Sequence, residues 1–224
     1  MKNHQKGFTL VEIAIVLVII GLLLGGVLKG QEMIENSRIK SIVNDMKAVQ
    51  AAYNGYIDRY KAIPGDDTAA TMLARGWPGT VGGTGNGVLL ITAAQTFTNG
   101  GEQGAFWRAM RASGLLQGDP TAPATAVGLP RHAGGGLMGV TSDLAGIYGQ
   151  NGVSVCVAGL NTKQAAGVDS LIDGALPANQ IGNSTGTIRG ETNAVNPFAP
   201  INTTPVGVAY NETAVTTWTV CMRI

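Results

Sequence analysis

The sequence FTLVEIAIVLVIIGLLLGGVL, residues 8–28, decides the class of this chain. It is a predominantly apolar run of about 21 residues, roughly 32 Å long as a helix, which is enough to cross the core of a bilayer. The residues before it are polar and include Lys2 and Lys6. Positive charge flanking a membrane span favours the cytoplasmic side, so the rest of the chain is expected outside the cytoplasm.

One acidic residue, Glu12, lies within this run. A carboxylate inside a membrane costs roughly 2.5–3.5 kcal/mol even on the most lenient insertion scale, and it needs a cationic partner. No small-residue cleavage site of the A-x-A kind follows the run, which argues against an ordinary secretory signal. An uncleaved signal anchor is the simpler alternative, but such an anchor gains nothing from Glu12.

The segment KGFTLVEIAIVLVIIGLLL, residues 6–24, resembles the N-terminus of the type IV pilin-like family, which includes pilins and the pseudopilins of type II secretion. The resemblance implies that a prepilin peptidase cuts between Gly7 and Phe8 and N-methylates Phe8. It also implies that Glu12 pairs with the new N-terminal amine of a neighbouring subunit during assembly. Cleavage creates a cation beside the apolar run, which is the partner that a buried carboxylate requires.

Helical periodicity continues after the apolar run. Apolar residues recur at steps of three and four, as in a helix with one buried face. They are Ile39, Ile42, Val43, Met46, Val49, Tyr53, Tyr56, Ile57 and Tyr60. Proline cannot continue a helix, so Ile63-Pro64-Gly65 is expected to end it.

Four parts of the chain follow from the resemblance and the pattern. Residues 1–7 are expected to be a cytoplasmic leader that prepilin peptidase removes, and residues 8–28 the transmembrane helix that forms the filament core. Residues 29–63 are expected to be an amphipathic helix that packs on the head, and residues 64–224 a globular α+β head. The head is low in charge and rich in Gly, Thr, Ala and Asn, and its segments 60–67, 84–88, 102–118 and 160–177 also resemble a subgroup of the family.

The expected fold is α+β and pilin-like, with a long N-terminal α-helix packed on a small antiparallel β-sheet. Short apolar runs predict the strands, and helical spacing predicts two further helices. The strands are expected at residues 87–92, 153–158, 187–190, 206–210 and 215–222, and the helices near 103–116 and 162–176.

The two cysteines, Cys156 and Cys221, are expected to form a disulfide, because the head is placed in an oxidising compartment. The bond would close a loop of about 65 residues and stabilise the fold by roughly 4 kcal/mol. Two unpaired buried thiols are the alternative. A redox-active pair is disfavoured because C-x-x-C is absent.

Composition excludes several functions. A formal net charge of +1 argues against a specific nucleic-acid site. The presence of only two cysteines and two histidines argues against a tetrahedral zinc site, so neither metal nor cofactor is expected. His132 is the one histidine in the head, and no catalytic triad follows from it, so the chain is not expected to be an enzyme.

Two weaker hypotheses concern the head. Calcium binding would use Asp66, Asp67, Asn86 and Asp173, but no stretch has the oxygen-ligand spacing of a calcium loop, and the two adjacent aspartates fit a turn or a helix cap. Glycosylation would use the N-x-[ST] triplets at Asn183, Asn202 and Asn211, which also arise by chance in such a sequence.

The sequence therefore predicts a structural subunit of a type IV pilus-like filament. Its expected partners are other pilin subunits, prepilin peptidase, the inner-membrane assembly machinery and, before assembly, membrane lipid. The precursor would be a single-pass inner-membrane protein with a periplasmic head, and the assembled subunit would lie in an extracellular pilus or a periplasmic pseudopilus. A minor pilin or a type II secretion pseudopilin is one alternative, and a monomeric membrane-anchored binding module is another.

Overall fold

The computed structural model describes residues 9–77, 81–98, 100–122, 128–143, 146–174, 182–205, 207–210 and 216–224. The chain divides into two compact units, Met1–Ser37 and Arg38–Ile224. Helix α1 (Leu10–Tyr60) contributes its first part to one unit and its second part to the other.

In the first unit, the apolar side chains of α1 have no cover. Leu10 is 91% exposed and Leu28 is 68% exposed, and the most apolar 18-residue window of the helix has no buried residue. By length and composition this helix can cross a membrane. A helix that is apolar on all sides is not stable when exposed to water, so it needs lipid or other helices around it.

In the second unit, α1 buries one stripe of side chains, which confirms the predicted periodicity. Its buried members are Ile39, Ile42, Val43, Met46, Val49, Ala52 and Tyr56. The helix ends at Tyr60, where Lys61 has a φ of 52°, so the turn precedes Pro64. Gly65 follows with a φ of 95°, and a Cβ at this position would lie 2.7 Å from Leu89, so only glycine fits this close approach.

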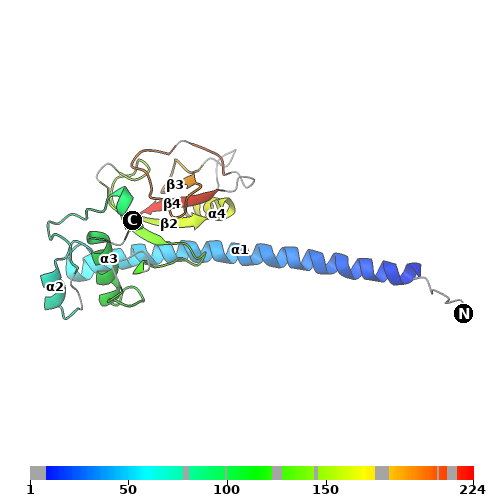
Figure 1. Ribbon diagram of the computed structural model, residues 1–224, viewed down its shortest axis with the longest axis horizontal. Helices are drawn as coiled ribbons and strands as arrows, with labels where there is room; N and C mark the ends of the chain where they lie inside the picture. Colours follow the sequence, from blue (N-terminus) through cyan, green and yellow to red (C-terminus); the bar gives the residue numbers. More distant parts are fainter. Residues whose placement is uncertain are drawn as a thin grey trace, which may run out of the picture. The chain divides into compact units, whose positions relative to one another are not determined.

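A four-stranded antiparallel sheet packs against this core, which confirms the predicted α+β class (Figure 1). Its strands are β1 (Met138–Thr141), β2 (Ser154–Leu160), β3 (Ile188–Asn193) and β4 (Thr217–Arg223). The order in the sheet is β1-β2-β4-β3, so the last strand of the chain pairs with β2 on one side and β3 on the other. Helices α3 (Glu102–Ala112) and α4 (Thr162–Asp173) match the two predicted head helices.

Two predicted strands are wrong. Residues 87–92 form no strand, although Leu89 and Ile91 are buried. The backbone of Ile91 bonds instead to Ser142. Ile91 N donates to Ser142 Oγ, and Ser142 N donates to Ile91 O. Both residues lie outside the helices and strands. Residues 207–210 also form no strand, and residue 206 lies outside the described residues.

Three short elements escaped the sequence analysis. They are strand β1, helix α2 (Ala69–Ala74) and the 3₁₀ turn η1 (Ala93–Gln95). Each has six residues or fewer, too few for a hydrophobic period to identify it. Strand β1 is nevertheless buried along its whole length, and it pairs with β2.

The stability of the head should depend on the stripe of α1. Ile42→Ala removes a fully buried side chain and should lower the free energy of unfolding by about 2–5 kcal/mol, because a cavity remains. Ile34→Ala, on an exposed position of the same helix, is the matched control and should change it little. Denaturant unfolding of the full chain in detergent measures both variants, and equal stability of the two would contradict the assignment of the stripe.

Candidate functional site

The start of α1 contains a reciprocal cap between Thr9 and Glu12. Thr9 donates to Glu12 Oε2 from its backbone N at 2.8 Å and from its hydroxyl at 2.7 Å. The backbone N of Glu12 in turn donates to Thr9 Oγ1 at 3.3 Å. This is the capping-box arrangement. The residue just before the helix and the third residue of the helix each accept a hydrogen bond from the other's backbone N–H.

The capping box has a sequence signature, T-x-x-E at residues 9–12, which the sequence analysis did not use. The structure thus gives the Glu12 carboxylate partners within its own chain. A glutamine could accept the same bonds without a charge, so the cap and the predicted ion pair make different demands on this position. Gly7 and Phe8, the predicted cleavage and methylation positions, lie outside the described residues.

Cys156 and Cys221 form the predicted disulfide. The two residues are register partners on neighbouring strands β2 and β4, and both are fully buried. Their α-carbons lie 4.0 Å apart. The bond therefore joins the two central strands of the sheet, and the alternative of two free thiols is wrong.

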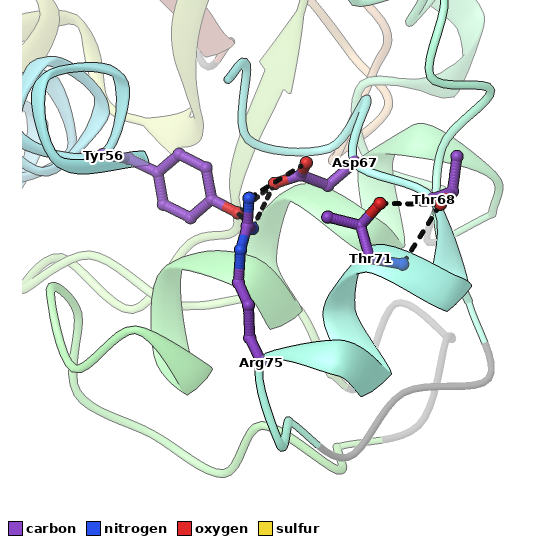
Figure 2. Close-up of polar contacts among 5 residues, drawn as sticks. All are labelled: Tyr56, Asp67, Thr68, Thr71 and Arg75. Atoms are coloured by element: carbon purple, nitrogen blue, oxygen red, sulfur yellow. Dashed lines mark hydrogen bonds and ion pairs between the residues drawn. The ribbon is translucent and has the colours of Figure 1, made fainter. Parts of the chain in front are cut away.

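A polar cluster of Tyr56, Asp67 and Arg75 joins α1 to the segment that follows it (Figure 2). Arg75 Nη1 donates to Asp67 Oδ2 at 2.6 Å and to Tyr56 Oη at 2.9 Å, and Tyr56 Oη donates to the same carboxylate. The position of Arg75 depends on α2, which it terminates. Thr68 begins that helix by accepting a bond from Thr71 N at 3.2 Å.

Aromatic rings surround the guanidinium of Arg75. It lies 4.7 Å from the centre of the Tyr60 ring and 5.1 Å from that of Trp77, within the range of cation–π attraction. Burial, together with Asp67, raises the pKa of Tyr56 well above its ordinary value, so the phenol stays protonated and can donate. Tyr56 and Tyr60 come from α1, and Trp77 comes from the segment after α2, so the cluster fixes this segment on the helix.

The carboxylates considered for calcium are engaged elsewhere. Asp66 accepts hydrogen bonds from Asn86 N at 3.0 Å and from Gly87 N at 2.7 Å. Asp173 accepts one from Ile188 N at 2.8 Å. Among the described residues, no group of three or more His, Cys, Asp or Glu side chains could hold a metal ion. Thr68, and not Asp66 or Asp67, caps the helix that follows.

A buried pair of Asp169 and Tyr210 connects α4 to the segment before β4. Tyr210 Oη donates to Asp169 Oδ2 at 2.7 Å, and both side chains are almost fully buried. Burial raises the pKa of Asp169 to about 6, against a hydrogen bond from Tyr210 that lowers it, and the nearby Asp173 adds to the rise. In the folded head, the ionised form of Asp169 is thus destabilised relative to the protonated form.

His132 and Asn183 are structural residues. His132 is buried, with Nε2 bonded to Ala158 O and Nδ1 accepting from Gly134 N, and its burial lowers its pKa. Asn183 is fully buried and donates to Gly190 O, so its triplet is inaccessible to a glycosyltransferase in the folded head. Asn202 is exposed, and Asn211 lies outside the described residues.

Comparison with known proteins agrees with the N-terminal pattern. Residues 2–28 match the prokaryotic N-terminal methylation motif. The chain is also similar to fimbrial protein EcpC from Eikenella corrodens, with 29% identity over 119 residues, which is 53% of this chain and 71% of the relative. Both matches are consistent with the type IV pilin family, the resemblance predicted from residues 6–24.

The Tyr56–Asp67–Arg75 cluster should contribute measurably to stability. Asp67→Asn removes the charge opposite Arg75 and should lower the free energy of unfolding by about 1–3 kcal/mol. Asp58→Asn is the control, because in the described part of the chain Asp58 makes an exposed ion pair with Lys61, and such pairs contribute little. Thermal unfolding of the two variants compares them directly, and equal melting temperatures would show that the cluster is not stabilising.

Asp169 should make the head less stable as the pH rises. Its pKa is about 6 in the folded protein against an ordinary value of 3.8, so the folded state binds the proton more tightly. The stabilising effect of protonation is fully present below about pH 4 and is lost as the pH rises through 6.

The comparison of Asp169→Asn with the native protein isolates this effect, because asparagine cannot ionise but can still accept from Tyr210. The difference in melting temperature, variant minus native, should grow in favour of the variant between pH 4 and pH 7. The same pH series on Asp58→Asn, a substitution at an exposed position, serves as the control. A difference for Asp169→Asn that is constant with pH would contradict the raised pKa.

Proposed function

We propose that this chain is a structural subunit of a type IV pilus-like filament, assembled through its N-terminal helix. The observation that carries the proposal is an apolar helix without cover in the first unit, whose first part lies within the methylation motif at residues 2–28. Such a helix is stable in a membrane before assembly and among identical helices after it, because both surroundings keep its side chains from water. The fimbrial relative supports the same role. A structural subunit needs no catalytic site.

The proposed processing removes residues 1–7 by cleavage between Gly7 and Phe8, with N-methylation of Phe8. Residues 8–28 then enter the filament core, residues 29–63 pack on the head, and residues 64–224 form the outer surface. Prepilin peptidase and the inner-membrane assembly machinery are the partners of this pathway. The precursor would sit in the inner membrane with its head in the periplasm, and the mature subunit would lie in an extracellular fibre.

Glu12 is the proposed assembly residue, and its local geometry makes the proposal sharper. Thr9 holds the carboxylate at the first turn of α1, four residues from the position where cleavage would create an amine. In an apolar filament core, a carboxylate with only neutral donors would remain an uncompensated charge. The amine of a neighbouring subunit supplies that compensation and sets the axial register of the two helices.

The second candidate role is a minor pilin or a type II secretion pseudopilin, which uses the same helix and the same processing. The two roles differ in abundance and in the fibre that contains the subunit. Intact-mass spectrometry of filaments sheared from cells distinguishes them. A dominant species that begins with N-methyl-Phe8 and contains one disulfide supports a major pilin. Processed protein found only in the membrane fraction supports the second role.

Two substitutions of Glu12 separate charge pairing from helix capping. Glu12→Gln keeps the acceptor of the capping box and removes the charge, whereas Glu12→Ala removes both. If the charge pairs with an amine, both variants should accumulate in the membrane and enter filaments at least tenfold less than the native subunit. Immunoblotting of sheared filaments and membranes measures the ratio.

The control for this experiment is Glu32→Gln, which alters another glutamate of α1, one that pairs with Lys29. It should be incorporated normally. Normal incorporation of Glu12→Gln beside poor incorporation of Glu12→Ala would assign Glu12 to the cap and overturn the charge-pairing proposal.

A further inference from the structure

We propose that a polar pocket at one end of the sheet binds a carboxylate-bearing sugar. The pocket has a volume of about 580 Å³, within the range of small-molecule sites. It lies where the ends of β3 and β4 meet the segment before β2, and its lining includes Gln150, Asn151, Thr187, Arg189 and Arg223. The proposal concerns the head alone and is independent of filament assembly.

Arg189 is held in place by neutral acceptors. Its Nη1 donates to Tyr148 O at 2.9 Å and its Nε donates to Gly186 O at 3.3 Å. A guanidinium has five N–H donors, of which these bonds use two. Backbone carbonyls orient the guanidinium without cancelling its charge. The remaining N–H donors can therefore bind an anionic group.

Arg223 adds a second positive charge to the same pocket. It is the last residue of β4, and its side chain is exposed. Among the described residues, no carboxylate forms an ion pair with either arginine. Ile224, the last residue of the printed sequence, also lines the pocket, and its terminal carboxylate offsets one of the two positive charges. The lining still has more positive than negative charge, which favours an anion, and the planar fork of a guanidinium matches a carboxylate.

The rest of the lining suits hydroxyl groups. Gln150 Nε2 donates to Gly186 O at 2.6 Å and to Thr187 O at 3.3 Å, which fixes the direction of the amide. Its Oε1 is buried and accepts no hydrogen bond from the described residues. Gln150 lines the pocket, and a small movement of its side chain would let a ligand hydroxyl donate to this acceptor, which stabilises a buried oxygen that otherwise has no partner. Asn151 and Thr187 add further polar groups beside it.

An acidic sugar combines these two features, because it presents a carboxylate and several hydroxyls on one rigid ring. The arginines would bind the carboxylate, and the amide and hydroxyl side chains would bind the ring hydroxyls. A bare tetrahedral oxyanion would use only the arginines, and a neutral sugar would use only the other groups. The pocket should therefore prefer the acidic sugar to both.

Isothermal titration calorimetry of the full chain in detergent tests this preference at low salt, with glucuronic acid, glucose and sodium sulfate as probes. Glucuronic acid should bind at least tenfold more tightly than glucose and more tightly than sulfate. Equal affinity for glucose and glucuronic acid, equal affinity for sulfate, or no binding of glucuronic acid would each overturn the proposal.

Variants locate the site. Arg223→Gln removes a side chain with no hydrogen bond of its own in the described structure, so the fold should be intact and the affinity for glucuronic acid should fall at least tenfold. Arg189→Gln should weaken binding as much, with circular dichroism to check its fold. Arg131→Gln is the matched control, because Arg131 also donates to a backbone carbonyl but lies outside the pocket. Unchanged affinity in Arg223→Gln would place binding elsewhere and contradict the assignment.

Discussion

Burial of the stripe of α1 between Ile39 and Tyr56 is the contact on which the rest of the head depends. The head has a four-stranded sheet and short helices, and each of these has an apolar face that needs a partner. The stripe supplies part of that partner, and the side chains of α3 and of the sheet complete the same core. Burial of apolar area is the largest favourable term in folding, so the helix acts as a structural part of the head and not only as a stalk.

The few charged side chains of the head hold segments of backbone that belong to no helix or strand. Only 13% of the residues are charged, yet Asp66 and Glu102 accept bonds from the backbone between Thr84 and Leu90. Asp67 and Arg75 fix the segment after α1 by a side-chain ion pair instead. A glycine-rich chain loses much conformational entropy on folding, and backbone donors in long non-repetitive segments need acceptors. Buried carboxylates provide both acceptors and fixed geometry, which explains why these aspartates are structural.

Glu12 illustrates how one residue can meet two demands. Inside its own chain the carboxylate completes the first turn of α1 with Thr9, which satisfies backbone donors at a helix start. The proposed neighbour amine would satisfy the charge, which the cap leaves unbalanced. The two requirements are compatible because a carboxylate has two oxygens, and the cap engages Oε2.

The sequence by itself determined the long helix, its exposed and buried parts, the disulfide and three of the four strands, because these depend on hydropathy period, length and cysteine count. It could also have revealed the capping box at residues 9–12. Only the tertiary structure decided that residues 87–92 are irregular although apolar, that β1 forms, and that Asp67 meets Arg75 and Tyr56. The pocket of Arg189 and Arg223 likewise exists only once β3 pairs with β4. These features depend on contacts between residues far apart in the chain, and no local pattern encodes such contacts.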